Sequence, residues 1–252
     1  MTRRISDRSE LWIYYLTIAL YFFAFGLQFI IYPALVTFVL RAPPGQVGLA
    51  QTALSSPMFA LLLIGGLLAE RTRNGRTMAW LYGAMALATA ALTYAVAAHA
   101  LTYPLLLVYA VTVGSCAALV GPARDAALNG VLDRVRFAPS IATAAAVTTS
   151  VQIGAQIAGI ITARSAGADP APYLAAQAAA LIAAAAVSLF LRAPKPAKRG
   201  GTLKTALADL KEGLNYAFKN PVMGPMLISS LYSGVFVIGS FQVLLPLIVR
   251  EE

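Results

Sequence analysis

The sequence predicts an all-α, polytopic membrane protein whose N-terminus lies in the cytoplasm. The first reason is composition, because 59% of the 252 residues are hydrophobic and 12% are charged, whereas soluble domains carry about a quarter charged residues. The second is a set of long segments without charge, and the third is the uneven distribution of basic residues. Segments that cross lipid must be helical, because the bilayer core offers no partner for open backbone groups.

Six segments contain no Asp, Glu, Lys or Arg, and they are residues 11–40, 46–69, 77–123, 137–163, 171–191 and 221–249. A bilayer core of about 30 Å takes roughly 20 helical residues, so each segment is long enough to cross it. Residues 77–123 provide two spans, separated near His99 and Pro104. Seven spans are therefore expected, as a six-helix bundle followed by a seventh helix.

The basic residues predict the orientation. Sixteen of the 19 Lys and Arg residues lie before span one or between spans two and three, four and five, and six and seven. Arg41, Arg164 and Arg250 lie on the other side. Because basic residues stay cytoplasmic, the N-terminus is inside and the C-terminus outside. The net charge of +9 thus reflects topology, and no nucleic-acid partner is inferred.

The spans are separated by recognisable turn segments. The first span, about residues 11–36, is rich in aromatic residues and has Pro33 near its outer end. The outer turn "RAPPGQ" follows, since two prolines and a glycine end a helix. The cytoplasmic segment "GGLLAERTRNGRT" joins spans two and three, span four ends in "GPARDAALNG", and span five begins near "FAPSIATAAA". Span six is alanine-rich and covers about residues 172–191.

The character changes after span six. Apolar residues recur at spacings of three and four among lysines, at Leu203, Leu207, Leu210, Leu214 and Phe218. This pattern predicts an amphipathic helix on the cytoplasmic membrane surface, with a flexible basic linker as the alternative. The expected domains are an N-terminal bundle (1–191), a basic connector (192–220) and the first helix of an incomplete C-terminal bundle (221–252).

The sequence offers little for catalysis or for cofactors. Cys116 and His99 are the sole residues of their types, so a disulfide within the chain is excluded and a thiolate metal site is not expected. No nucleophile with a base and no carboxylate pair lies within one membrane region. We expect no metal, no cofactor and no enzymatic activity.

The segment "GGLLAERTRNGR" resembles the signature loop between helices two and three of the major facilitator superfamily. Gly66, Glu70 and Arg71 match the pattern Gly-x-x-x-Asp-Arg, whereas Arg73 stands where the loop usually has glycine. The stretches "GPARDAAL" and "LADLKEGLNYAFKNPVM" resemble the efflux branch that includes enterobactin and macrolide exporters. The resemblance runs through essentially the whole chain and implies the N-terminal portion of a major facilitator fold.

In such transporters the signature loop belongs to a cytoplasmic latch between two helix bundles. The latch residues implied here are Gly66, Glu70, Arg71, Arg73, Arg76, Arg124 and Asp125. Asp125 is the natural partner for Arg71 or Arg76, and Gly65 with Gly66 lets span two approach another helix closely. The alternative is an ordinary basic loop that only sets topology, although that role needs neither the glutamate nor the glycines.

Span five carries a ridge of small residues every four positions, and it includes Ala146, Ser150, Gly154 and Ala158. Small residues let helices pack closely in lipid, so we expect this ridge to face a neighbouring helix. The exporter motif of this helix often reads Gly-Pro-x-x-Gly-Gly. The segment "GAQIAG" keeps its outer glycines but has Ala155 in place of proline, which weakens an inference of antiport.

Polar residues at bilayer depth usually face protein or a water-filled cavity. Thr148, Gln152 and Gln156 form such a row on span five. By resemblance, helices one, four and seven line the central cavity. The substrate-cavity candidates are Tyr21, Phe25, Gln28, Tyr32, Tyr109, Gln152, Gln156, Tyr232 and Gln242. The alternative for each is packing between helices or a place at the membrane interface.

The leading hypothesis is a secondary active transporter in the bacterial inner membrane. It would export small amphipathic molecules of the drug or siderophore type by alternating access, with the lipid bilayer, the substrate and a coupling proton as partners. We expect the chain to need a missing C-terminal half, lost by truncation or encoded by a split gene. The alternatives are a non-transporting scaffold and an importer of the same fold. A seven-helix receptor or retinal pigment conflicts with the charge distribution and with the absence of lysine from 221–249.

Overall fold

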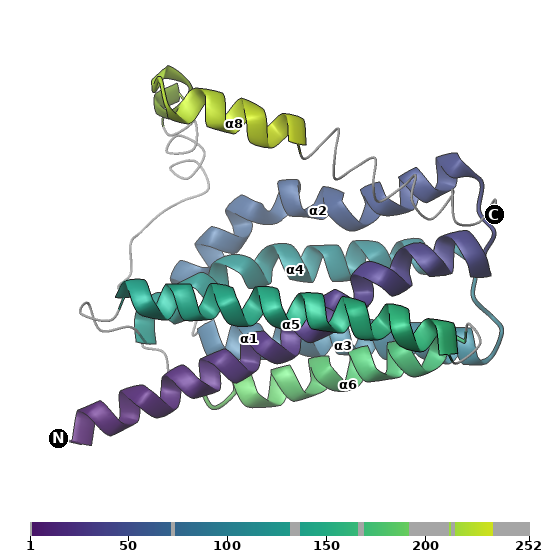
Figure 1. Ribbon diagram of the computed structural model, residues 1–252, viewed down its shortest axis with the longest axis horizontal. Helices are drawn as coiled ribbons and strands as arrows, with labels where there is room; N and C mark the ends of the chain where they lie inside the picture. Colours follow the sequence, from purple (N-terminus) through teal and green to yellow (C-terminus); the bar gives the residue numbers. More distant parts are fainter. Residues whose placement is uncertain are drawn as a thin grey trace.

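The chain folds as a bundle of long helices in the computed structural model (Figure 1). The structure describes residues 2–71, 74–131, 137–165, 169–191, 212 and 215–233. The elements are α1 (Thr2–Ala34), the π-helical turn η1 (Leu35–Val39), α2 (Pro44–Arg71), α3 (Asn74–Ala97), α4 (Tyr103–Val131), α5 (Phe137–Ser165), α6 (Ala171–Ser188) and α8 (Met223–Tyr232). Within the described residues every regular element is helical. The predicted all-α fold is confirmed.

Most of these helices are long and apolar enough to cross a membrane. Among the described residues, five segments meet both criteria: Ser9–Val39, Asn74–Ala97, Tyr103–Gly130, Ala138–Ile161 and Ala171–Ser188. α2 has 28 residues and, at 1.5 Å per residue, is about 42 Å long, which also exceeds the bilayer core. The seventh expected span begins with α8, and its remainder lies outside the described residues. Most of the expected amphipathic connector helix lies outside them as well.

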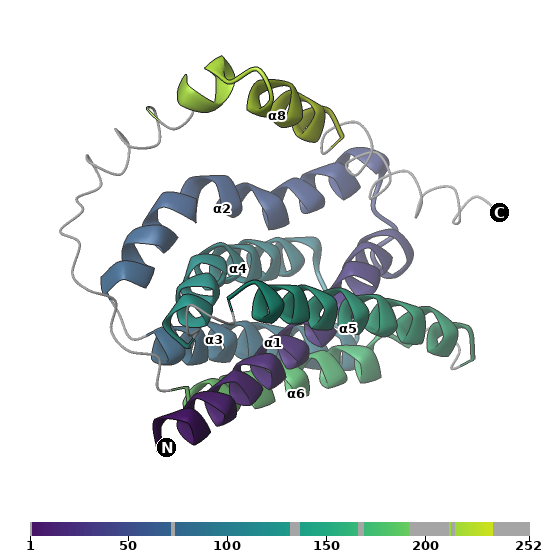
Figure 2. The ribbon, with the colours of Figure 1, turned by 60° about the vertical axis from the view of Figure 1, so that its left-hand side comes forward.

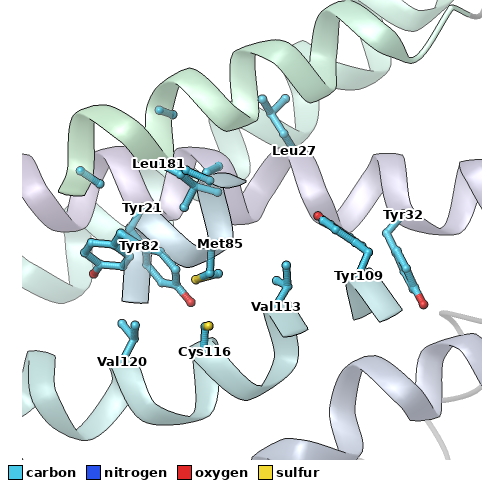
Figure 3. Packing of buried hydrophobic residues seen from close by; sticks show 14 of the residues in the cluster. Tyr21, Leu27, Tyr32, Tyr82, Met85, Tyr109, Val113, Cys116, Val120 and Leu181 are labelled. Carbon is cyan, nitrogen blue, oxygen red and sulfur yellow. The ribbon is translucent and has the colours of Figure 1, made fainter. Parts of the chain in front are cut away.

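The helices pack side by side in an order that differs from their order in the chain. α2 packs against α4, α4 against α3, α3 against α6, α6 against α1, and α1 against α5. The six helices run roughly along one direction, and α8 lies apart from them in both views (Figures 1 and 2). The buried core lies between α1, α3, α4 and α6. Tyr21, Tyr82, Met85 and Leu181 lie together in one part of it, and Tyr109 lies farther along α4, beside Tyr32 (Figure 3).

The outer end of α1 widens just beyond Pro33. A proline has no N–H to donate within the helix, and the following residues form the π-helical turn, in which the Leu40 N–H donates to the Leu35 carbonyl at 2.9 Å. Two phenols tie this end of the bundle together. The Tyr32 hydroxyl donates to the Ala50 carbonyl at 2.7 Å and the Tyr103 hydroxyl to the Gln46 carbonyl at 2.8 Å. Both acceptors belong to α2, so the outer ends of α1, α2 and α4 are joined.

Glycine permits the close contact between α2 and α4. A methyl group added at Gly114 would collide with the Leu54 carbonyl oxygen. Near the inner end, a methyl group at Gly65 would lie 3.1 Å from the Ala118 carbonyl oxygen. The close approach of span two that was predicted from Gly65 is therefore present. In lipid, where hydrophobic burial does not drive helices together, such contact between backbones stabilises the pair through van der Waals packing.

The contact between α1 and α5 shows which face of α5 is buried in this bundle. A methyl group at Gly26 would lie 2.5 Å from the Gln152 carbonyl oxygen and 2.8 Å from the Ala155 side chain. The buried face of α5 therefore contains Ala144, Ala155 and Gly159. The residues of the predicted packing ridge, Ala146, Ser150, Gly154 and Ala158, are exposed on the described bundle, so their packing against another helix stays a prediction. Neighbouring residues on a helix point about 100° apart, so the packing of Ala155 against Gly26 turns Gly154 away from α1.

We expect Gly114→Ala to destabilise the bundle, because the new methyl group meets a backbone carbonyl that cannot rotate away. Overpacking of this kind costs about 1–3 kcal/mol, which corresponds to a fall in the melting temperature of about 2–12 °C for a chain of this size. Thermal unfolding of the purified protein in detergent measures the change.

Gly83→Ala is the matched control, since a methyl group at Gly83 on α3 meets nothing within 4 Å. Alanine favours a helix over glycine by about 1 kcal/mol, so this variant should melt at or slightly above the parent temperature. Equal melting temperatures for the two variants would contradict the close contact at Gly114.

Candidate functional site

Arg124 and Asp125 form an ion pair near the inner end of α4. The Arg124 Nε and Nη2 atoms both donate to Asp125 Oδ1 at 3.3 Å. Strong bonds between charged groups measure about 2.7–2.9 Å, so this pair is long. The cause is geometric, because adjacent residues on a helix do not face each other. The pair is also uneven in exposure, at 24% for the Arg124 side chain and 68% for that of Asp125.

The Arg124 guanidinium also links α4 to α1. Its central carbon lies 5.3 Å from the centre of the Phe22 ring. A cation above an aromatic face is stabilised by the ring, and the gain is larger where water is scarce. Phe22 is itself in edge contact with Tyr21 and Phe25. A charged side chain from α4 is therefore held by the aromatic residues of α1.

The predicted latch is described only in part. Asp125 pairs with Arg124, and the exposed Arg76 side chain at the start of α3 forms no ion pair with Asp125 among the described residues. The backbone of residues 66–71 forms the end of α2. The surroundings of Gly66, the side chains of Glu70 and Arg71, and the whole of Arg73 lie outside the described residues. The structure thus places Arg124, Asp125 and Arg76, and the pairing it shows is between sequence neighbours.

The Phe22 ring belongs to an aromatic cluster between α1 and α3. The Tyr21 ring lies 5.1 Å from Tyr82 and stacks on Phe25 at 6.2 Å. Tyr21 also contacts Phe22, whose ring lies under the Arg124 guanidinium, so Tyr82 is linked to that guanidinium through two ring contacts. Tyr82 is fully buried, and its hydroxyl has no hydrogen-bond partner among the described residues. Sequence reasoning did not include Tyr82 in this cluster, because Tyr82 lies on α3 and is far in the chain from the aromatic residues of α1.

A second polar group lies deeper in the bundle. The Gln177 Nε2 on α6 donates to Gln28 Oε1 on α1 at 3.2 Å and to the Tyr109 hydroxyl on α4 at 3.1 Å. Gln177 is 0% exposed, and its Oε1 has no partner among the described residues. These bonds join three helices through side chains.

The structure separates the cavity candidates into two groups. Tyr21, Gln28, Tyr32 and Tyr109 are buried between helices of this bundle, so they do not line an open surface here. Tyr32 and Tyr109 lie next to each other, with ring centres 6.2 Å apart (Figure 3). The Gln28 amide oxygen and the hydroxyls of Tyr32 and Tyr109 form hydrogen bonds within the bundle. Gln177 was not predicted, although a lone glutamine within the alanine-rich span six was the available signal.

The remaining candidates are accessible to different degrees. Phe25, Gln152 and Gln156 are half-buried, and Tyr232 on α8 is exposed. Gln242 lies outside the described residues. Within the part of the chain that the structure describes, no group of three His, Cys, Asp or Glu side chains lies together where it could hold a metal ion.

Comparison with known proteins gives one clear match. The family model of the Major Facilitator Superfamily matches residues 14–252. The match includes all of the helices described above except the first turns of α1. A search of curated proteins found no match.

We expect Gln177→Met to destabilise the bundle by about 1–3 kcal/mol, because Gln28 Oε1 loses its donor and the Tyr109 hydroxyl loses a bond. Unfolding of the purified protein by sodium dodecyl sulfate measures the loss. The double variant Gln28→Met, Gln177→Met should lose less than the sum of the two single variants, since both partners are then apolar. Gln156→Met on α5 is the control, and it should shift stability by less than about 0.5 kcal/mol. Additive effects of Gln28 and Gln177 would contradict their coupling.

Proposed function

Because this chain belongs to the Major Facilitator Superfamily, a family of membrane transporters, we propose that it is part of a secondary active exporter of small amphipathic molecules. It provides the N-terminal bundle and the start of the second bundle, and its matched residues and apolar helices support this role. The exporter lies in the bacterial inner membrane with its N-terminus in the cytoplasm. Substrate sites of such transporters lie between two bundles, so the activity requires the C-terminal half.

The observation that best supports alternating access is the long ion pair at the inner end of α4. A transporter rocks between two states, and contacts that form in one state and break in the other bias that equilibrium. The Arg124–Asp125 pair is weak enough to exchange partners, and Asp125 is exposed enough to reach another group. We propose that Asp125 joins Glu70, Arg71, Arg73 and Arg76 in a cytoplasmic latch when the two bundles close on that side.

Few groups in this chain are placed to bind a coupling proton. No Asp or Glu lies deep within any of the expected spans. Asp125, Glu70 or an acid of the C-terminal half is therefore the group that binds the proton. A carboxylate that changes its pairing between two states is suited to couple protonation to the conformational change.

The half-buried candidates suit an amphipathic ligand. Phe25 offers an aromatic face, and Gln152 and Gln156 offer amides that donate and accept hydrogen bonds. All three lie near the crossing of α1 and α5, where Gly26 contacts Gln152. Tyr232 and Gln242 of the seventh helix are proposed to face them from the second bundle.

Transport is tested with Nile red, a neutral amphipathic dye. We expect cells that produce the complete transporter to export the dye when energised, and Phe25→Ala to lower the export rate by about tenfold, as loss of a large contact of about 1.4 kcal/mol would. Trp12→Ala on the same helix is the control, since Trp12 is 72% exposed, and it should leave export unchanged. Dye uptake instead of export would indicate an importer, and transport of neither this neutral dye nor naphthoate by the folded protein would indicate a scaffold.

The latch is tested by accessibility. In a Cys116→Ser background with a reporter cysteine at Gln156, we expect Asp125→Asn to increase labelling from the cytoplasmic side and to decrease it from the outside, because the closed latch loses a charge. Asp169→Asn is the matched control, since this exposed carboxylate lies between α5 and α6 on the outer side. Membrane-impermeant maleimide applied to vesicles of each orientation measures the change. Unaltered labelling in Asp125→Asn would contradict the latch.

A further inference from the structure

We propose that Arg124 and Tyr82 form an anion-binding site that takes the carboxylate of an amphipathic ligand, and that Asp125 occupies the guanidinium until this ligand displaces it. This inference rests on the proposed transport function, because it assigns a negative charge to the transported substrate. The binding that it requires is measured without transport, so the two proposals can fail separately.

The first argument is the poor geometry of the resident ion pair. Two nitrogen atoms of Arg124 share one oxygen atom of Asp125 at 3.3 Å. A guanidinium offers five N–H donors in a planar fork, and a carboxylate that faces the fork accepts two parallel bonds. Asp125 cannot reach that position from the next residue of the same helix. A free carboxylate can do so, and it therefore competes well with Asp125.

The second argument is the unequal exposure of the two partners. Asp125 is 68% exposed, so it regains water when it is displaced, whereas the Arg124 side chain is 24% exposed and stays between α4 and the rings of α1. Charges interact more strongly away from bulk water. Among the described residues, Asp125 is the carboxylate that interacts with Arg124. Its displacement leaves a cation that only an incoming anion neutralises.

The third argument is an unused donor next to an apolar surface. The Tyr82 hydroxyl is fully buried and has no partner among the described residues. The Tyr82 ring lies 5.1 Å from that of Tyr21, which contacts the Phe22 ring under the Arg124 guanidinium. A buried hydroxyl without a partner costs free energy, and a ligand oxygen would satisfy it. Phe22, Tyr21 and Phe25 lie beside these groups. The site thus combines donors for an anion with aromatic faces for an apolar ligand body.

Equilibrium dialysis of the purified chain in dodecyl maltoside with naphthoate tests the proposal. We expect naphthoate to bind more tightly than neutral naphthalenemethanol or cationic naphthylmethylamine. Arg124→Gln should weaken naphthoate binding by about tenfold or more, because the bonds to a charged group are lost. Tyr82→Phe should weaken it a few-fold, and Asp125→Asn should strengthen it because the competing carboxylate is removed.

Size-exclusion chromatography and thermal unfolding confirm that each variant is folded. If Arg124→Gln does not fold, Tyr82→Phe and Asp125→Asn still decide the outcome. Equal binding of the three probes, or no change of naphthoate affinity in either of these two variants, would overturn the proposal. Dialysis against nanodiscs separates a soluble ligand from a lipid headgroup. Loss of naphthoate binding in phosphatidylglycerol but not in phosphatidylcholine would assign the site to the headgroup and would also overturn it.

Discussion

Close contact between helix backbones holds this bundle together, because lipid supplies no hydrophobic drive between one helix and the next. At Gly114 the α4 backbone meets the Leu54 carbonyl of α2, and at Gly26 the α1 backbone meets Gln152 of α5. These contacts bring long helices near enough for their side chains to interlock. They also decide which face of each helix is buried, and hence which polar and aromatic residues lie inside.

The polar groups of the interior are stabilised unevenly. Gln177, Gln28 and Tyr109 bond with one another, but Gln177 Oε1 and the Tyr82 hydroxyl have no partner among the described residues. Burying a polar group without a hydrogen-bond partner costs free energy. A role in binding a ligand is one reason for such a group to be present. Tyr82 is linked to Arg124 through the rings of Tyr21 and Phe22, and the proposed anion site accounts for its unpartnered hydroxyl.

The two ends of the bundle differ in how firmly they are joined. At the outer end, Tyr32 and Tyr103 donate short bonds to backbone carbonyls of α2. At the inner end, Arg124 is held by a long ion pair and a ring contact. A firm outer end with an exchangeable charge at the inner end suits a transporter whose cytoplasmic side opens and closes while each bundle moves as a unit. The proposed latch and the proposed anion site both use this exchangeable charge.

The sequence by itself determined the all-α membrane fold and the boundaries of most spans, because charge-free length and hydropathy directly reflect the solvent around each segment. Its signature loop also indicated the family, which the match over residues 14–252 shows. Only the tertiary structure decided that Asp125 pairs with Arg124, that the small-residue ridge of α5 faces outward, and that Gln28 and Tyr109 bond to Gln177. The physical reason is that helix periodicity limits which residues share a face. The rotation of that face toward a neighbour depends on contacts such as Gly26 against Gln152, which join residues far apart in the chain.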